Sequence, residues 1–595
     1  MDIYAIITNA VRDYLVASDG SEPEKNIIQI QKTRKEFDGD LTLVVFPLLR
    51  ITKKSPEQSA EDIGAYLVEH CSEIDAYNVI KGFLNLVVSP VYWSLKLEEM
   101  TSDMEYGRIN PTSDSLLYMI EYSSPNTNKP LHLGHIRNNL VGNSISRIMQ
   151  ANGFRVSQVN LVNDRGIHIC KSMLAWQKWG NGATPESTGK KGDHLVGDYY
   201  VMFDRTLKEQ VREMVAAGSK QENAEKEAPL LQEAQEMLRK WEAKDPEVIS
   251  LWEKMNSWVY AGFDVTYDRL GVSFDKIYYE SQTYKLGRAI VLEGLEKGIL
   301  YKKDDGSIWA DLTGDGLDQK LLLRADGTSV YMTQDLGTAV QRYEESHFNT
   351  HIYVVGNEQD YHFQVLALIL KKLGYDWADR LYHLSYGMVE LPDGKMKSRE
   401  GKVVDADDLM DEMFTTARDM STDLGKLEGF AEDEKEGIFN TIGLGALKYF
   451  ILKVDPKKNM IFDPVESVDF NGNTGPFIQY SYARIRSVMQ KAEEEGLLPG
   501  ITEGLEMNDK ERGLIRMLYF YPETVQMAGE DRSPAHIANY CYELAREFNQ
   551  FYHEFSIMSA ETVELKKFRL LLAGMVARCI ASGMELLGID VPERM

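Results

Sequence analysis

Residues 126–135, NTNKPLHLGH, place two histidines, a lysine and a glycine directly after the strand-like run SLLYMIEYSSP. His132 and His135 are three residues apart, so both imidazoles fall on one face of a helix and can donate to the same phosphate. Lys129 adds a positive charge, and Gly134 leaves room for a flat group against the backbone. The N-terminus of a helix also offers free N–H groups and a positive dipole end. The stretch therefore predicts a nucleotide pocket.

Two other interpretations of His132 and His135 stay open. Histidines at this spacing can hold zinc, and buried histidines can also be purely structural. No third ligand follows at the spacing of a metal site, so the sequence predicts no bound metal. The phosphate-binding loops GxxxxGKS/T and GxGxxG do not occur in this stretch, which disfavours those two routes to a nucleotide.

A second basic stretch, LPDGKMKSREGKVV at residues 391–404, contrasts with the rest of the chain. Lys395, Lys397, Arg399 and Lys402 lie close together there, although the 595-residue chain has a formal net charge of −26. Such a loop alone is usually solvated surface, but together with the histidine stretch it indicates a second phosphate-binding element. The acidic total argues against a polyanionic partner unless positive charge is concentrated on one face.

The hydrophobic pattern predicts the elements that position these residues. Residues 1–112 combine amphipathic helices with the strand-like runs LTLVVFPLL and GFLNLVVS, which indicates a small α+β domain. Residues 113–465 alternate apolar strands with helices, which predicts an α/β fold with a doubly wound parallel sheet. A charged stretch at about 180–272 is interpreted as a helical insertion in that domain. Residues 466–595 predict an all-α bundle.

The sequence also predicts where a ligand binds and in which compartment the protein works. Doubly wound sheets bind ligands beyond the carboxyl ends of their strands, and EYSSPNTNKPLHLGH occupies such an end. No apolar run approaches the roughly 18 residues that span a bilayer, and the N-terminus lacks the features of a secretion signal. The cysteines are too widely spaced for a disulfide framework or a zinc site: Cys71, Cys170, Cys541 and Cys579. We expect a cytoplasmic protein with reduced thiols.

On these two stretches the sequence resembles class I aminoacyl-tRNA synthetases, whose signatures are a HIGH tetrapeptide and a KMSKS loop. Here they read His132-Leu133-Gly134-His135 and Lys395-Met396-Lys397-Ser398-Arg399, in a loop at residues 394–402. Within the class the chain most resembles the arginyl-tRNA synthetase family, over nearly its whole length. The matching segments are EYSSPNTNKPLHLGHIR, NLVNDRG, YMTQDLGTA, VVGNEQDYHFQ, NTGPFIQYSYARIRS and LLGIDVPERM.

The resemblance implies a Rossmann-like, HUP-type catalytic domain that makes arginyl-adenylate from L-arginine and ATP with Mg²⁺. The arginyl group is then transferred to the 3′ end of tRNA(Arg). It also implies that residues 1–112 contact the tRNA elbow, that residues 466–595 form a DALR-type anticodon-binding domain, and that the protein is a monomer. No structural metal and no membrane association are implied.

Residue roles are implied at the matching positions. The arginine-binding set is Glu121, Ser123, Asn126, Tyr331, Asp335 and Gln359. The ATP-binding set is His132, Gly134, His135, Asn138, Gly356, Glu358, Lys395, Met396 and Ser398. The catalytic set is His132, His135, Lys129, Lys395 and Lys397. The signature region comprises Pro125, Asn126, Thr127, Asn128, Lys129, Pro130, Leu131, His132, Leu133, Gly134 and His135.

Chemistry agrees with the arginine set, because a guanidinium is a planar fork of donors that demands carboxylates and carbonyl oxygens. For tRNA, the resemblance and the interleaved aromatic and basic residues suggest stacking surfaces and phosphate contacts, although core packing of the tyrosines is an equal alternative. That set is Tyr480, Tyr482, Arg484 and Arg486.

The second signature departs from the family pattern. Lys397 stands at the usual serine, and Ser398 stands at the usual second lysine. Lys397, or Lys129 from the first stretch, could take over the role of that lysine. Two alternatives remain: an inactive synthetase-like protein that binds tRNA, and a metal hydrolase that uses His132, His135 and His362.

Overall fold

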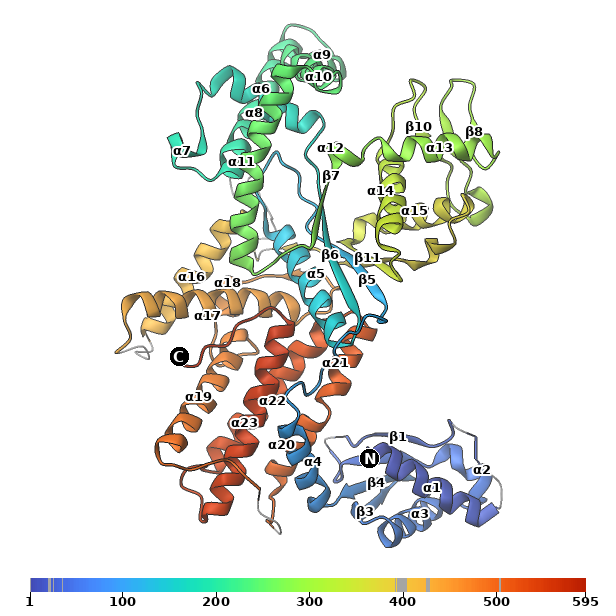
Figure 1. Cartoon of the computed structure of the whole chain (residues 1–595), viewed down its shortest axis with the longest axis vertical. Helices are drawn as coiled ribbons and strands as arrows, with labels where there is room; N and C mark the ends of the chain where they lie inside the picture. Colours follow the sequence, from blue (N-terminus) through green and yellow to red (C-terminus); the bar gives the residue numbers. More distant parts are fainter. Residues whose placement is uncertain are drawn as a thin grey trace.

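The computed structural model describes residues 2–19, 23–24, 26–34, 36–390, 392, 404–423, 429–501 and 505–595. They form an N-terminal α+β module, a parallel-sheet domain with two additions, and a C-terminal helical bundle (Figure 1). This arrangement confirms the predicted fold class. All four cysteines are free and buried. Among the described residues, no helix combines the length and apolar character needed to cross a bilayer.

The N-terminal module is a four-stranded antiparallel sheet, in the order β1-β2-β4-β3, with helices packed on it. Helix α1 buries Ile3, Ile7, Val11 and Leu15, whose spacing of four residues makes one apolar stripe. The elements are α1 Ile3–Asp19, β1 Gln29–Lys32, β2 Leu41–Val44, α2 Leu49–Thr52, α3 Pro56–His70, β3 Ile74–Ile80, β4 Phe83–Val88 and α4 Pro90–Ser102.

The central domain is built on a five-stranded sheet whose strands are all parallel. In its order β12-β11-β5-β6-β7, the chain first moves from β5 to β6 and later returns to β11 on the other side. The order reverses between β5 and β11, and such a switch point is where doubly wound sheets bind ligands. The strands are β5 Leu117–Glu121, β6 Arg155–Val162, β7 Lys276–Tyr279, β11 Thr350–Gly356 and β12 Leu381–Tyr386.

Neighbouring residues of β5 enter two different hydrophobic cores, as the two-residue repeat of a strand requires. Ile120 joins the larger core with helix α5 (Leu133–Ala151). Met119 joins a second core with helices α14 (Tyr331–Ser346) and α15 (Asp360–Lys372). Both faces of the sheet are covered, which explains why its strands read as nearly continuous apolar runs.

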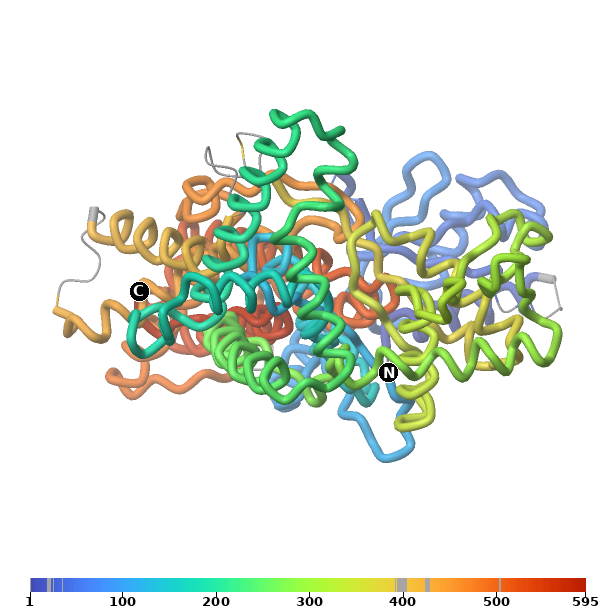
Figure 2. Tube along the Cα trace, turned by 90° about the horizontal axis from the view of Figure 1, so that it is seen from above, coloured from blue at the N-terminus to red at the C-terminus, as the bar shows by residue number. Residues whose placement is uncertain are grey.

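Two additions follow the carboxyl ends of β6 and β7 and flank that edge of the sheet (Figures 1 and 2). The first is the helical insertion, which begins ahead of the predicted residue 180 because α6 already packs against α8 and α10. Its helices are α6 Ile167–Trp179, α7 Pro185–Thr188, α8 Gly192–Ala216, α9 Gln221–Glu227, α10 Pro229–Glu242 and α11 Pro246–Leu270.

The second addition is a lobe with three short antiparallel strands, which the sequence analysis did not predict. Strands of two to four residues are too short to show a two-residue repeat. Its elements are α12 Glu280–Thr283, α13 Leu286–Glu296, β8 Tyr301–Lys302, β9 Ile308–Ala310 and β10 Lys320–Leu323.

The described chain after β12 is almost entirely helical, and this includes residues 466–595, for which an all-α bundle was predicted. Helix α19 packs against α22 and α23, and α20 is joined to α23 by a buried ion pair, Arg569 Nε to Glu511 Oε1 at 2.8 Å. The predicted domain limits at residues 112 and 465 stay predictions. Near the second limit, helix α17 packs against both α5 of the central domain and α19 of the bundle. The elements are β13 Val389–Glu390, α16 Ala406–Asp423, α17 Glu432–Leu452, β14 Met460–Ile461, α18 Pro464–Ser467, α19 Gly475–Glu494, α20 Asp509–Tyr519, α21 Tyr521–Glu530, α22 Ala535–Glu554 and α23 Val563–Leu586.

The N-terminal module lies against this bundle, beside α20 (Figure 1). The Tyr519 hydroxyl accepts the N–H of Ile3 at 3.2 Å, and the Tyr519 ring contacts that of Trp93 with centroids 5.5 Å apart. Arg578 of α23 donates to the backbone carbonyl of Thr101 at 3.1 Å. The two ends of the chain therefore form one continuous body.

Candidate active site

The turn after β5 is held in an unusual backbone conformation. Ser123 and Ser124 have φ of 76° and 45°, in the left-handed region that residues with a side chain rarely adopt. The N–H of Ser123 donates to Asn138 Oδ1 at 2.5 Å, and the N–H of Ser124 donates to Asn160 Oδ1 at 3.0 Å. Such conformations persist only where surrounding contacts hold them, and they gather at functional sites.

His132 and His135 cap the N-terminus of α5 with their ring nitrogens. His132 Nδ1 accepts the N–H of Gly134 at 3.1 Å, and His135 Nδ1 accepts the N–H of His132 at 3.2 Å. This pattern assigns the ring proton of each neutral imidazole to Nε2. Each ring therefore presents one Nε2–H donor, which is a more specific state than the sequence predicted.

Burial keeps both imidazoles uncharged. It lowers the pKa of His132 to about 4 and that of His135 well below its ordinary value, and the charge of Lys129 acts in the same direction. Burial also lowers the pKa of Lys129, and no carboxylate among the described residues offsets this shift. One ammonium beside two neutral donors suits the negative oxygens of a polyphosphate.

A cavity of about 420 Å³ lies at the switch point between β5 and β11. This volume is within the range of about 300–1,000 Å³ that is typical of small-molecule sites. Asn138 also lines this cavity, but its side-chain amide is hydrogen-bonded within the protein, because its Nδ2 donates to the carbonyl of Val354 at 2.7 Å. The structure brings together the predicted ATP-binding residues that it describes: His132, Gly134, His135, Asn138, Gly356 and Glu358.

A larger cavity of about 1290 Å³ adjoins it, and the two share the lining residues Ser124, Asn126 and Gln359. Ser123 does not line the larger cavity. It lines the smaller cavity, which contains His132 and His135 and is called the histidine cavity below, and its hydroxyl lies 2.6 Å from that of Tyr267. The larger cavity contains the other predicted arginine-binding residues, Glu121, Asn126, Tyr331, Asp335 and Gln359.

The two predicted carboxylates of this cavity already have partners. Glu121 forms an ion pair with Arg342, a buried residue of α14 whose guanidinium lies 4.7 Å from the centre of the Tyr278 ring. Asp335 Oδ2 lies 2.6 Å from His362 Nε2. Sequence reasoning missed Arg342, although its spacing of seven residues from Asp335 places both on one helical face.

Glu280, the first residue after β7, is a third carboxyl of the same cavity that the sequence analysis missed. Burial raises its pKa to about 7, and the negative charges of Asp164 and Asp335 add to the shift, while Arg165 opposes it from 3.9 Å. The signal available in the sequence was its position, an acidic residue at the carboxyl end of a strand. Four carboxyl groups therefore line this cavity, those of Glu121, Glu242, Glu280 and Asp335, and they can receive a cationic ligand even though Arg165, Lys285, Arg288 and Arg324 line it as well.

Other predicted site residues lie elsewhere. Lys395, Met396, Lys397, Ser398 and Arg399 lie outside the described residues. The predicted tRNA-binding residues belong to α19, remote from both cavities in sequence and lining neither. Tyr482 is buried with its hydroxyl 3.2 Å from Glu593, and Arg484 donates to Asn549 at 2.6 Å. Arg486 pairs with Glu593, and Arg484 lies 4.8 Å from the Tyr480 ring centre.

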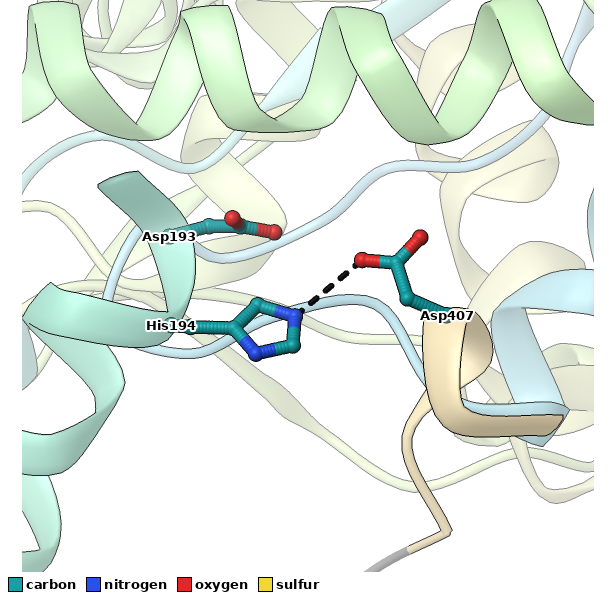
Figure 3. A group of neighbouring side chains, drawn as sticks. All are labelled: Asp193, His194 and Asp407. Atoms are coloured by element: carbon teal, nitrogen blue, oxygen red, sulfur yellow. Dashed lines mark hydrogen bonds and ion pairs between the residues drawn. The ribbon is translucent and has the colours of Figure 1, made fainter. Parts of the chain in front are cut away.

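No observation on the described residues favours the metal hydrolase, because His362 lies in the larger cavity while His132 and His135 line the smaller one. A different group, Asp193, His194 and Asp407, brings potential metal ligands within 4.8 Å of one another (Figure 3).

Comparison with known proteins agrees with this geometry. A family model described as "tRNA synthetases class I (R), catalytic domain" matches residues 101–464, and one described as "DALR anticodon binding domain" matches residues 478–595. The arginine–tRNA ligase of Bacteroides thetaiotaomicron is 60% identical over 597 residues, covering 100% of both chains. That of Parabacteroides distasonis is 61% identical over 593 residues, covering 99% of both.

Among solved structures, the arginyl-tRNA synthetase of Thermus thermophilus matches with a TM-score of 0.77 at 23% identity, covering 100% of both chains, which bears on the fold alone. The parallel sheet, the capped HxGH loop at its switch point and the two family models define a class I aminoacyl-tRNA synthetase. Within that class, the chain belongs to the arginyl-tRNA synthetase family. The predicted family is therefore confirmed.

Proposed function

We propose that this protein is an arginine–tRNA ligase that uses L-arginine, ATP with Mg²⁺ and tRNA(Arg). A carboxylate oxygen of arginine attacks the α-phosphorus of ATP, the bond to the β-phosphate breaks, and pyrophosphate leaves. A terminal ribose hydroxyl of the tRNA then attacks the carbonyl carbon of arginyl-adenylate, loses its proton, and releases AMP. We place this activity in the cytoplasm, as the sequence predicted, and in a monomer, as the family resemblance implies.

The observation that carries this proposal is the common wall of the two cavities. An arginine whose guanidinium meets the carboxyl groups of the larger cavity can direct its carboxylate toward Asn126 and Gln359, where the cavity lined by His132 and His135 begins. An ATP in the histidine cavity would meet it there with its α-phosphate. Holding two reactants in such an arrangement can supply about 7–11 kcal/mol of the barrier reduction.

Selectivity for arginine follows from the carboxyl groups of the larger cavity. Asp335 and Glu280 can accept hydrogen bonds from a planar fork of donors, while Arg342 fixes the position of Glu121. A lysine side chain would satisfy fewer of these acceptors and leave others buried without a donor. Sites of this kind can discriminate by about 10⁴ to 10⁵.

In the adenylation step the chain mainly positions the reactants and stabilises negative charge. The Nε2–H groups of His132 and His135 are directed at phosphate oxygens without carrying charge, and Lys129 supplies the ammonium. Loss of one preorganised donor of this kind typically costs about 3–4 kcal/mol of transition-state stabilisation. Mg²⁺ would be bound as part of the ATP substrate, where it would supply positive charge to the phosphates and would require few protein ligands. The tRNA contacts of the N-terminal module and of Tyr480, Tyr482, Arg484 and Arg486 remain part of this proposal.

The test is incorporation of labelled pyrophosphate into ATP, measured with each standard amino acid in the presence and absence of tRNA(Arg). We expect exchange with arginine and with no other amino acid, and stimulation by the tRNA. Exchange driven by a different amino acid would contradict the proposed substrate. No exchange under any condition, with tRNA still bound, would indicate the inactive tRNA-binding alternative.

A further inference from the structure

Asp407, in the first turn of α16, is held by three side chains of the helical insertion. Its carboxylate contacts the ammonium of Lys191, lies 3.1 Å from His194 Nε2, and accepts the Thr266 hydroxyl at 3.1 Å. Figure 3 shows His194 and Asp407 approaching each other from two separate segments. Burial alone would raise the pKa of Asp407, but the hydrogen bonds from His194 and Lys191 lower it to about 2.

Lys191 balances the negative charge of the neighbouring carboxylates of Asp193 and Asp407. Its Nζ lies 3.0 Å from Asp193 Oδ2 and 2.6 Å from the Thr266 hydroxyl, in addition to its contact with Asp407. The ammonium therefore supplies the positive charge that a metal ion would otherwise bring to these carboxylates. The group is an ion-pair network that joins the insertion to α16.

The residues just before Asp407 are hydrogen-bonded to residues 131–133 of the HIGH signature, here called the HIGH loop. The N–H of Leu133 donates to the carbonyl of Val404 at 3.1 Å, and the N–H of Ala406 donates to the carbonyl of Leu131 at 3.0 Å. His132 and Asp405 face each other in this short antiparallel bridge. The segment that precedes Asp407 is thus the bridge partner of the segment that contains His132.

We propose that Asp407 is a positioning residue for His132. The insertion holds the carboxylate of Asp407 in place, and the backbone hydrogen bonds of residues 404–406 thereby fix the position of the HIGH loop. The inference rests on the proposed function, since it concerns the same adenylation step. It gives the helical insertion a task in catalysis, although the insertion supplies neither His132 nor His135. Asp407 lines neither cavity, so its loss should act on rate and leave the arginine cavity intact.

The test compares Asp407→Asn with Asp408→Asn, which removes the same charge from the same helical turn at an exposed position. For Asp407→Asn we expect kcat of arginine-dependent exchange to fall by about 10- to 100-fold, the size of effect that a displacement of about 1 Å produces. The dissociation constant of arginine, measured by calorimetry without ATP, should stay within about twofold. Asp408→Asn should match the wild-type protein in both.

A double-mutant cycle tests whether the effect passes through the insertion. Lys191→Met should lower kcat in the same way, and Lys191→Met combined with Asp407→Asn should be no worse than the more affected single variant. Lys191→Arg, which keeps the charge, should recover most of the rate. Thermal unfolding of each variant identifies any loss of folded protein.

The outcomes separate the two proposals. If the wild-type protein performs no arginine-dependent exchange, the proposed function fails. If the wild-type protein is active and folded Asp407→Asn is equally active, only the positioning role fails. Additive losses in the double variant, or an arginine affinity that falls in step with kcat, would also overturn that role.

Discussion

At the scale of single residues, the described part of the site combines two neutral imidazole donors with the ammonium of Lys129. Sequence spacing predicted His132, His135 and Lys129 as phosphate ligands. It could not predict that both Nδ1 atoms are used to cap α5, because that depends on ring orientation. The ion pair between Glu121 and Arg342 joins residues 221 positions apart, so no local pattern could reveal it.

Lys129→Ala tests the division of work between the two cavities. Lys129 lies beside the histidines and not among the residues of the arginine cavity. We therefore expect the adenylation rate to fall by about 10²-fold or more, as for the loss of one charge-stabilising donor, with little change in arginine affinity. Single-turnover adenylation and calorimetric arginine binding measure the two effects. Equal losses in both would contradict this role.

Glu280 predicts a pH dependence of arginine binding. Its pKa is raised to about 7 in the empty cavity, and a bound guanidinium favours the ionised carboxylate, so arginine binding releases a proton when the pH is below 7. The affinity for arginine should therefore fall as the pH falls, by about 10-fold between pH 8 and pH 6. Glu280→Gln should remove this dependence and keep a low affinity throughout. Titration calorimetry at several pH values checks both statements; an unchanged slope in the variant would assign the proton to another group.

At the scale of elements, the site depends on how α5, β6 and β11 brace the turn after β5. The parallel strands and the position of the turn were predictable, since long apolar runs alternate with helices. The lobe containing β8, β9 and β10 was missed because its strands are too short to show a repeat. The bridge between residues 131–133 and 404–406 was also beyond prediction, because it joins two loops distant in sequence.

Asn138 tests the bracing of the strained turn, and its neighbour Asn139 is a matched control. Both amides are buried in α5, but only Asn138 bonds to the turn and to β11, whereas no polar side-chain atom of Asn139 has a partner among the described residues. Asn138→Ala leaves a buried N–H and a carbonyl unsatisfied, at a cost of about 2–4 kcal/mol. We expect it to lower the unfolding midpoint and the exchange rate well beyond Asn139→Ala. Similar effects of the two variants would show that the bonds contribute little.

At the scale of the whole molecule, the N-terminal module and the bundle are joined through Tyr519, Trp93 and Arg578. The sequence predicted both bodies but not their contact, since packing between distant helices leaves no periodic signal in either. Because the two modules proposed to contact tRNA form one body, we expect their spacing to stay fixed when tRNA binds.

Salt dependence tests how an acidic protein with a net charge of −26 binds a polyanion. If positive charge is concentrated on the face that contacts tRNA, the dissociation constant of tRNA(Arg) should rise steeply with salt, because counterions are released on binding. We expect a change of more than about 10-fold between 50 and 200 mM KCl, and Arg484→Gln should reduce the slope. Filter binding over a salt series measures it. A flat dependence would contradict phosphate contacts as the main source of affinity.

The shared wall at Asn126 and Gln359 also has a consequence for inhibitor chemistry. A single compound that carries a guanidine at one end and an adenosine at the other, joined by a linker that cannot be cleaved, would fill both chambers at once. Tethering makes the second half bind as an intramolecular event, so the compound should bind far more tightly than its separate fragments. Linker length would set this gain, and the optimum should match the short reach of an acyl-phosphate link.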